Sequence, residues 1–494
     1  MIEQNLSLLL VVIPLLAAPV TAIVPSARIA WLLTLVATWL CLIMAAWQLA
    51  IVLDGSIISY ELGGWSPPWG IEYRIDAMNA FVALIVSGIA AITLPYALRT
   101  VEKEIPKHHI PMFYAIFLLS LVGLLGIVQT GDVFNLFVFL EISSLSSYVL
   151  IAMGQQRRAL TAAYQYLIMG TIGATFLLIG IGLLFAETGT LNMMDLNQRL
   201  QPILDHRTVH TGFAFIVVGI ALKLALFPLH LWLPNAYKYA PSFVSVFLAS
   251  TATKVAVYIM LRMVFTVFSS EFVNITPTRD IFLLLGAFGV IIASVAAVYQ
   301  DDIKRLLAYS SIAQVSYMVL GIGLASTLGI TAALVHVFNH ALMKGALFMA
   351  CGALVYRVGS SRFEDLKGLG RRMPWTFAAI FVAGLSLIGI PGTAGFISKW
   401  YFILAALENQ SWPIIIIAVL GSLLALVYVW RIVELMFLQP LPDSGRAVDE
   451  APASLLIPMW FLVIANIYFG FNTELTVDVA GTAARLLGVG AYNE

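Results

Sequence analysis

Long runs of apolar residues follow one another along the whole chain, and short polar segments separate them. A helix needs about 20 apolar residues to cross roughly 30 Å of hydrocarbon, and the runs have about that length. No stretch is left over for a separate soluble domain. The pattern therefore predicts an all-α polytopic membrane protein with about fourteen spans, near residues 5–24, 28–50, 77–98, 111–130, 132–153, 160–186, 210–236, 241–266, 279–299, 306–327, 329–356, 375–407, 412–438 and 453–473.

Two of these spans, the seventh and the twelfth, are interrupted by proline. Pro228 lies in LFPLHLW and Pro391 lies in GIPGTAG, where Gly392 follows it. A proline inside a span frees backbone groups that need another partner or a water-lined cavity. Interrupted spans in corresponding positions, here five helices apart, indicate an internal repeat around a site near the middle of the membrane.

Composition narrows the function. Hydrophobic residues make up 61% of the chain and charged residues 11%, whereas a soluble domain carries roughly 25% charged residues. The formal net charge is zero, which argues against a nucleic-acid partner. The N-terminal MIEQN is acidic and lacks the basic region of a signal peptide, so the first span should remain in the protein.

No motif for a bound cofactor is visible. Cys41 and Cys351 lie in apolar runs without a CxxC or Cys/His cluster, so we expect neither disulfides, zinc nor iron–sulfur centres. The chain has no Gly-rich loop for a nucleotide or dinucleotide. Redox or ATP chemistry is therefore absent or supplied by partners.

Basic residues are distributed unequally between the two sets of loops. Loops that leave odd-numbered spans hold sixteen: Arg28, Arg99, Lys103, Lys107, Arg157, Arg158, Lys238, Lys304, Arg305, Arg357, Arg362, Lys367, Arg371, Arg372, Arg431 and Arg446. The other loops and the C-terminal tail hold five: Arg74, Arg199, Arg207, Arg279 and Arg485. The positive-inside rule places the first set in the cytoplasm and both termini outside, in the inner (plasma) membrane.

Ionisable residues inside the spans indicate an ion path. Lysine is predicted within four spans, at Lys223, Lys254, Lys344 and Lys399, while Arg262 is near enough to a span end to snorkel. A charge in hydrocarbon is costly and is kept mainly where it lines a polar path. Because burial disfavours the charged form of lysine and a carboxylate restores it, a glutamate that approached Lys223 could switch its proton on and off.

Glu141 is the one carboxylate near the middle of a span. Ser144 and Tyr148 follow at i+3 and i+7, and Ser250, Lys254 and Tyr258 form a similar stripe spaced by four. A hydrogen-bond network between helices is the alternative explanation for the serines. For Glu141 we favour a functional role.

The segment VHVFNHALMKGALF places His336, His340 and Lys344 four residues apart on one helix face. A histidine pair at this spacing could bind zinc, but a third ligand and the glutamate of HExxH are missing. Buried histidines bonded to backbone carbonyls are a second alternative. A proton relay fits better, because histidine titrates near neutral pH.

The segments GDVFNLFVFLE, KLALFPLHLWLPNAYKYAPS, STATKVAVY, FNHALMKGALF and GIPGTAGFISKW resemble the antiporter-like subunit family. That family comprises large membrane subunits of Mrp-type cation/proton antiporters, respiratory complex I and membrane-bound hydrogenases. The resemblance covers spans four to thirteen, and length and span count look most like the D-type antiporter subunits.

The resemblance implies two inverted five-helix repeats, at 111–266 and 279–438, after N-terminal helices at 1–110 and before a C-terminal helix and tail at 439–494. It also implies roles for the buried residues. Glu141 and Lys223 would form a charge pair, Lys254 would link the halves, His336, His340 and Lys344 would form the central axis, and Lys399 would be the exit-side site.

The functional expectation that follows is a proton-translocating subunit of a multisubunit Na⁺/H⁺ or K⁺/H⁺ antiporter, working with other membrane subunits and carrying no redox cofactor. The alternative is proton pumping in a hydrogenase or NADH–quinone oxidoreductase assembly, since FVFLEISSLSSYVL and NAYKYAPS also fit those members. A self-sufficient carrier is less favoured, because the sequence shows no carboxylate-rich cation cage.

Overall fold

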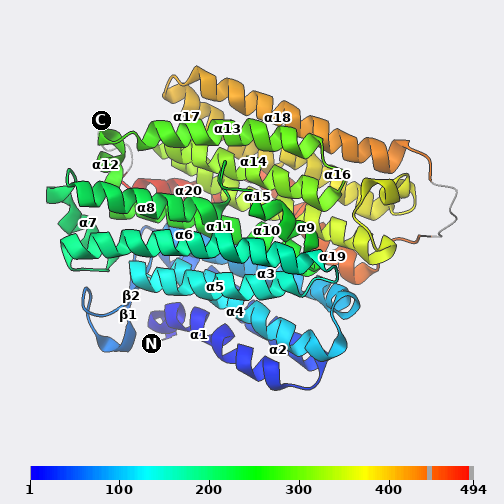
Figure 1. Cartoon of the computed structure of the whole chain (residues 1–494), viewed down its shortest axis with the longest axis horizontal. Coiled ribbons are helices and arrows are strands. Elements are labelled where there is room, and N and C mark those ends of the chain that lie inside the picture. The colour runs from blue at the N-terminus through cyan, green and yellow to red at the C-terminus, as the bar shows by residue number, and fades with distance from the viewer. Residues whose placement is uncertain (1, 442–447, 489–494) are drawn as a thin grey trace.

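The computed structural model describes residues 2–441 and 448–488, which form a bundle of roughly parallel and antiparallel helices (Figure 1). Thirteen helical segments of this part of the chain are long and apolar enough to cross a membrane. They are α1 (Ile2–Ile23), α2 (Ala27–Val52), α3 (Ala77–Glu104), α4 (Ile110–Gln129), α5 (Val133–Ala152), α6 (Arg158–Thr188), α8 (Arg207–Leu224), α10 and α11 with the π-helical turn after them (Ser242–Val267), α13 (Thr278–Val298), α14 (Ile303–Gly323), α15 (Thr327–Val358), α18 with its π-helical turn (Trp412–Leu438) and α19 (Ala453–Phe471).

A fourteenth span is divided into α16 (Pro374–Ile388) and α17 (Ala394–Glu408), which are each too short to cross alone. With this pair included, every predicted span has a helical counterpart whose limits differ by a few residues. The predicted all-helical polytopic fold is therefore confirmed. The domain limits at residues 110, 266, 279 and 438 stay predictions.

Three spans are interrupted, one more than the sequence indicated. The first break separates α8 from α9 (Trp232–Tyr239), and the second separates α16 from α17, as the two prolines predicted. The third lies between α10 (Ser242–Ser250) and α11 (Ala252–Leu261), where Thr251 leaves the helical conformation at φ −125° and ψ −55°. No glycine or proline marks this third break, only a cluster of hydroxyl side chains from Ser250 to Thr253.

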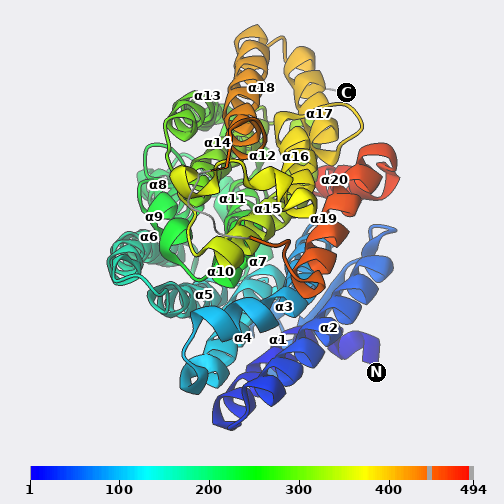
Figure 2. The same ribbon diagram turned by 90° about the vertical axis from the view of Figure 1, so that its right-hand side faces the viewer.

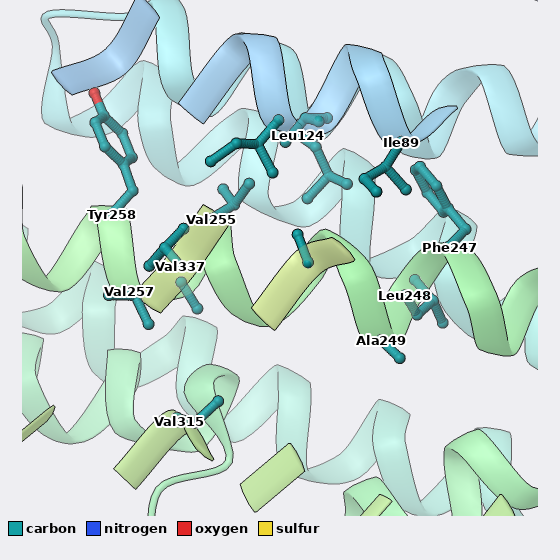
Figure 3. Close-up of a cluster of buried hydrophobic side chains, with 14 of the residues drawn as sticks. Ile89, Leu124, Phe247, Leu248, Ala249, Val255, Val257, Tyr258, Val315 and Val337 are labelled. Carbon is teal, nitrogen blue, oxygen red and sulfur yellow. The ribbon is translucent and has the colours of Figure 1, made fainter. Parts of the chain in front are cut away.

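Helix α15 runs through the middle of the bundle (Figure 2), and almost every residue from Gly329 to Leu354 is buried. Helices α3, α10 and α14 pack against it, and α16, α17 and α19 cover its other side. Figure 3 shows α10 and α11 between Ile89 and Leu124 on one side and Val315 on the other. The outer helices α1, α2, α6, α13 and α18 are largely exposed and carry the apolar side chains expected to contact lipid.

Shorter elements gather at the end of the bundle where both described termini lie (Figure 1). Strands β1 (Ile58–Glu61) and β2 (Glu72–Ile75) form an antiparallel hairpin in the loop after α2, with Ile58 opposite Ile75. Helices α7 (Met193–Leu200) and α12 (Ser269–Ile275) lie at the same end. Within the segment expected to be the C-terminal tail, α20 (Glu474–Leu486) packs its apolar face against α3 and α15.

Loops that follow odd-numbered spans lie at one end of the bundle and loops that follow even-numbered spans lie at the other, as fourteen spans require. One cavity is lined by segments that follow odd-numbered spans, including Glu104, Arg158, Lys238 and Arg362. A second cavity is lined by segments that follow even-numbered spans, including Arg74 and Gly131. We call the first end the basic face. Arg446, counted with that face above, lies outside the described residues, and the orientation in the cell stays a prediction.

Candidate functional site

The Lys223 ammonium lies beside Glu141 where α8 breaks. Its Nζ is 3.3 Å from Glu141 Oε1 and donates a hydrogen bond to Ser144 Oγ at 2.8 Å. Helix α8 ends at Leu224, and Ala225 after it turns the chain away with a φ of 57°. Trp232 Nε1 donates to the Leu222 carbonyl at 3.0 Å in the last turn of the helix. The predicted pairing of Glu141 with Lys223 is thus present in the geometry, and the break holds the lysine in place.

A small cavity separates Lys223 from the next interrupted span. Its volume is about 30 Å³, and Ser144, Ser147, Lys223 and Ala252 are among the residues that line it. A cavity of about 10–15 Å³ already accommodates one water molecule when polar groups line it. The space is therefore large enough for one or two water molecules between Lys223 and the start of α11.

Lys254 is completely buried just after the third break. Its ammonium donates to the Ala249 carbonyl at the end of α10 and lies 3.4 Å from Thr253 Oγ1. The carbonyl end of a helix carries partial negative charge, which stabilises a cation there. The break that the sequence did not reveal thus supplies the acceptor for this lysine.

The stripe on α11 continues beyond Lys254 to an ion pair. Tyr258 Oη donates to the Val128 carbonyl at 3.3 Å and accepts from Arg262 Nε at 3.2 Å. Arg262 Nη2 lies 2.6 Å from Asp76 Oδ2, and both residues are buried. The expectation that Arg262 snorkels was wrong, because Asp76 at the start of α3 neutralises it inside the protein.

His336 is held at both ring nitrogens on α15. Nδ1 is 2.8 Å from Ser398 Oγ, and Nε2 is 3.0 Å from Gln314 Oε1. The ring of His340 is parallel to that of His336, with centroids 5.8 Å apart. Both nitrogens of His340 are buried, and no described residue is bonded to them, which is the environment that internal water occupies in proteins.

Lys344, one turn further along α15, is also completely buried. It donates to the Leu307 carbonyl at 2.9 Å and to Ser310 Oγ at 2.5 Å, both on α14. Lys254, His336, His340 and Lys344 are thus all buried on α11 and α15, which pack against each other at the middle of the bundle.

Lys399 lies at the second proline-interrupted span. Its ammonium donates to the carbonyls of Leu387 at 3.1 Å and Ile388 at 2.8 Å, and to Ser422 Oγ at 3.0 Å. It also lies 5.2 Å from the ring centroid of Tyr317. Since Ser398 is its neighbour in the chain and bonds His336, Lys399 continues the central axis.

All seven predicted residues thus line one polar array through the bundle, although their roles stay proposals. Sequence reasoning missed four residues that contact them: Ser310, Gln314, Tyr317 and Ser398. Gln314 could have been noticed, because an amide in the middle of an apolar span needs a partner. The serines and Tyr317 gave no comparable signal, since such residues are common in membrane helices.

Within residues 2–441 and 448–488, no three His, Cys, Asp or Glu side chains are grouped so that they could hold a metal ion. The predicted independence from a cofactor remains a prediction.

Comparison with known proteins finds relatives that match most of the chain. Residues 130–425 match the family model described as "NADH:quinone oxidoreductase/Mrp antiporter, TM". NADH-quinone oxidoreductase subunit N of Desulforudis audaxviator is 39% identical over 492 residues, covering 96% of this chain and 97% of that protein. The D-type subunit of a Na⁺/H⁺ antiporter from Alkalihalophilus pseudofirmus is 31% identical over 425 residues, covering 86% and 85%.

Two solved structures share the fold over nearly the full length. A chain of the Mrp complex from Dietzia sp. DQ12-45-1b superimposes with a TM-score of 0.91 at 25% identity, covering 99% of this chain and 98% of that one. A chain of the membrane-bound sulfane sulfur reductase, an archaeal respiratory membrane complex, gives 0.88 at 29% identity and covers 98% of each.

Proposed function

Because the chain belongs to the NADH:quinone oxidoreductase/Mrp antiporter transmembrane family, we propose that it is the proton-translocating membrane subunit of a multisubunit Na⁺/H⁺ or K⁺/H⁺ antiporter. It works beside other membrane subunits, as the similarity to chains of multisubunit complexes supports. Protons move along the buried array, and the cation crosses in the assembled complex. The expected location is the plasma membrane, with both termini on the non-cytoplasmic side.

The observation that carries this proposal is the series of ionisable groups across the middle of the bundle. Lys223, Lys254, the two histidines, Lys344 and Lys399 lie on interrupted or central helices, Glu141 pairs with Lys223 from α5, and hydroxyl, amide or carbonyl groups bond all of them except His340. Ionisable residues buried inside a membrane are costly, and in membrane proteins they mark pathways for protons and ions. This series of groups supports the passage of protons through the bundle.

A second candidate is proton pumping in a redox-driven respiratory complex. It is favoured by the 39% identity with an NADH-quinone oxidoreductase subunit N, which extends over almost the entire chain. The buried array would serve in the same way, and a partner subunit would supply the electron transfer. The chain would then translocate protons without redox chemistry of its own.

Purification of the native complex and reconstitution into vesicles with an internal pH dye distinguishes the two. A pH change on addition of Na⁺ or K⁺ without an electron donor supports the antiporter. A pH change that requires an electron donor and a quinone supports the pump. A complex that moves no protons under either condition overturns both.

A further inference from the structure

A polar cavity opens at the basic face between the ends of α3, α9, α14 and α15. Its volume is about 420 Å³, and it is lined mainly by polar and charged groups, among them Glu104, Gln156, Lys238, Asp302 and Lys304. We call this cavity the vestibule. It lies against the start of α10 at Pro241 and the end of α15 at Val355, the helices that carry or support the central lysines.

Lys304 is the buried group at the bottom of the vestibule. The sequence placed it in a loop, but it lies in the first turn of α14 and is only 5% exposed. Its ammonium is 3.4 Å from both the Ala240 carbonyl and Ser242 Oγ. It forms no ion pair with any described residue, because Asp302 pairs with Lys238 at 3.3 Å.

The acidic groups around Lys304 are held by other partners. Glu104 Oε2 accepts from the Ser242 backbone N–H at 2.6 Å, which satisfies the start of α10. Asp302 caps α14 by accepting from the Arg305 N–H at 3.1 Å and accepts from the Ser361 hydroxyl at 2.7 Å. Neither carboxylate forms an ion pair with Lys304, so Lys304 is not held in place by a structural ion pair with them.

Lys304 and the two groups that bind Lys344 belong to the same helix, α14. Lys344 binds the Leu307 carbonyl and Ser310 Oγ, which are three and six residues after Lys304 on α14. At 1.5 Å of rise per residue, the backbone positions of Leu307 and Ser310 lie about 4.5 and 9 Å along the helix axis from that of Lys304. Proton transfer between the two lysines therefore needs water or hydroxyl groups between their ammonium groups.

A hydroxyl group without a partner lies beside this route. Tyr96 is completely buried, and its Oη has no hydrogen-bond partner among the described residues. A side chain at Gly352 would meet Tyr96 Oη and Ser242 Cβ, so the hydroxyl lies against α15 between the vestibule and Lys344. A buried hydroxyl of this kind is a site for an internal water molecule.

We propose that the vestibule is the aqueous mouth of the central axis, and that Lys304 transfers protons between its water and Lys344. This inference rests on the proposed proton translocation and assigns it an opening at the basic face. The Lys344 ammonium releases a proton through Ser310 or water to the neutral Lys304 amine, and the Lys304 ammonium then releases it to water in the vestibule. The reverse sequence carries a proton inward, and only O–H and N–H bonds form and break.

Arginine and methionine at position 304 separate proton transfer from a structural charge. Arginine keeps the positive charge near Ser242 but holds its proton at all accessible pH values, so it cannot relay. We expect Lys304→Arg and Lys304→Met each to lower proton transport by about 100-fold in an assembled complex, the scale of one positioned proton-transfer group. Lys107→Arg, at an exposed site on the same face, is the matched control and keeps wild-type transport. Wild-type transport by Lys304→Arg overturns the proposal.

Access from the basic face is tested independently of residue 304. Gln156 lines the vestibule and is exposed, whereas both native cysteines, Cys41 and Cys351, are buried and unreactive controls. A bulky, impermeant maleimide is added to vesicles that carry Gln156→Cys, and to the exposed control His108→Cys on the same face. We expect labelling at Gln156 to block transport and labelling at His108 to leave it intact.

Complete labelling at Gln156 with full transport overturns the vestibule as the mouth, even where Lys304 variants fail to assemble. The same measurements distinguish a failure of the vestibule proposal from a failure of the proposed proton translocation. If the wild-type complex transports protons and Glu141→Gln does not, the proposed function holds and the Lys304 and Gln156 results test the vestibule alone. If the wild-type complex transports no protons, the proposed function itself fails.

Discussion

Replacing Glu141 by glutamine removes one charge and keeps the shape of the side chain. The carboxylate is 3.3 Å from the Lys223 ammonium, and its side chain is 25% exposed, against 7% for the lysine. At that separation and an effective dielectric constant near 20, the attraction is about 5 kcal/mol. The partial exposure of Glu141 reduces this figure, and broken buried pairs generally cost about 3–5 kcal/mol. The variant therefore leaves the Lys223 ammonium without its charged partner.

Because about 1.4 kcal/mol corresponds to a factor of ten, we expect proton transport by Glu141→Gln to fall by about 100-fold or more. The measurement is cation-driven or donor-driven acidification of vesicles that contain equal amounts of assembled complex. Glu141→Asp retains the charge at a longer reach and should keep part of the activity. Glu187→Gln, which alters another glutamate near a span end, is the matched control and should transport normally. An assembled Glu141→Gln complex that transports at the wild-type rate would refute the role of the pair.

Three further outcomes are expected. Lys399→Ala should lower transport as strongly as Glu141→Gln, because it leaves the carbonyls of Leu387 and Ile388 at the end of α16 without their donor. The control Lys107→Ala, at an exposed site, should transport normally. Equal vesicle acidification by the two variants would contradict this prediction. Asp76→Asn should destabilise the purified protein by about 3–5 kcal/mol, because it leaves Arg262 buried without its partner; the measurement is a lower unfolding temperature. Arg74→Ala, which breaks a more exposed ion pair, should cost about 1 kcal/mol or less. Similar shifts for the two variants would be inconsistent with a buried ion pair at Asp76. Gly352→Ala should lower the free energy of unfolding by about 1–3 kcal/mol, because the added methyl group clashes with Tyr96. Gly182→Ala, where the methyl group meets open space, should change it little. The same unfolding assay measures both, and an unchanged stability of Gly352→Ala would show that α15 moves aside easily.

Much of the fold could be predicted from the sequence because lipid imposes a strong rule on it. Each span must be apolar over a fixed length, so the spans were found to within a few residues, including the one divided at Pro391. The break at Thr251 could not be found in this way. Its cause is the competition of hydroxyl side chains and Lys254 for backbone carbonyls, which depends on the side chains packed around it.

The candidate site was predictable where residues are unusual for their surroundings. Glu141 and the buried lysines were found because charges are rare in hydrocarbon. Lys304 was missed for the opposite reason, since it follows two aspartates in a polar segment that resembles an exposed loop. Whether it is buried depends on Ala240 and Ser242, more than sixty residues away in the chain. Contacts of that range are set by the packing of whole helices.

The lysines of the array are stabilised by partners of two different kinds. Lys254 and Lys399 are stabilised by backbone carbonyls at interrupted helices, and Lys344 by a carbonyl and a hydroxyl of α14. Amide carbonyls do not titrate in the physiological range, so these partners stay in force at any pH the cell meets. Lys223 instead depends on the side-chain carboxylate of Glu141. A single substitution can therefore remove the partner of Lys223, whereas the carbonyl acceptors of Lys254, Lys344 and Lys399 belong to the backbone and remain whatever side chain their residues carry.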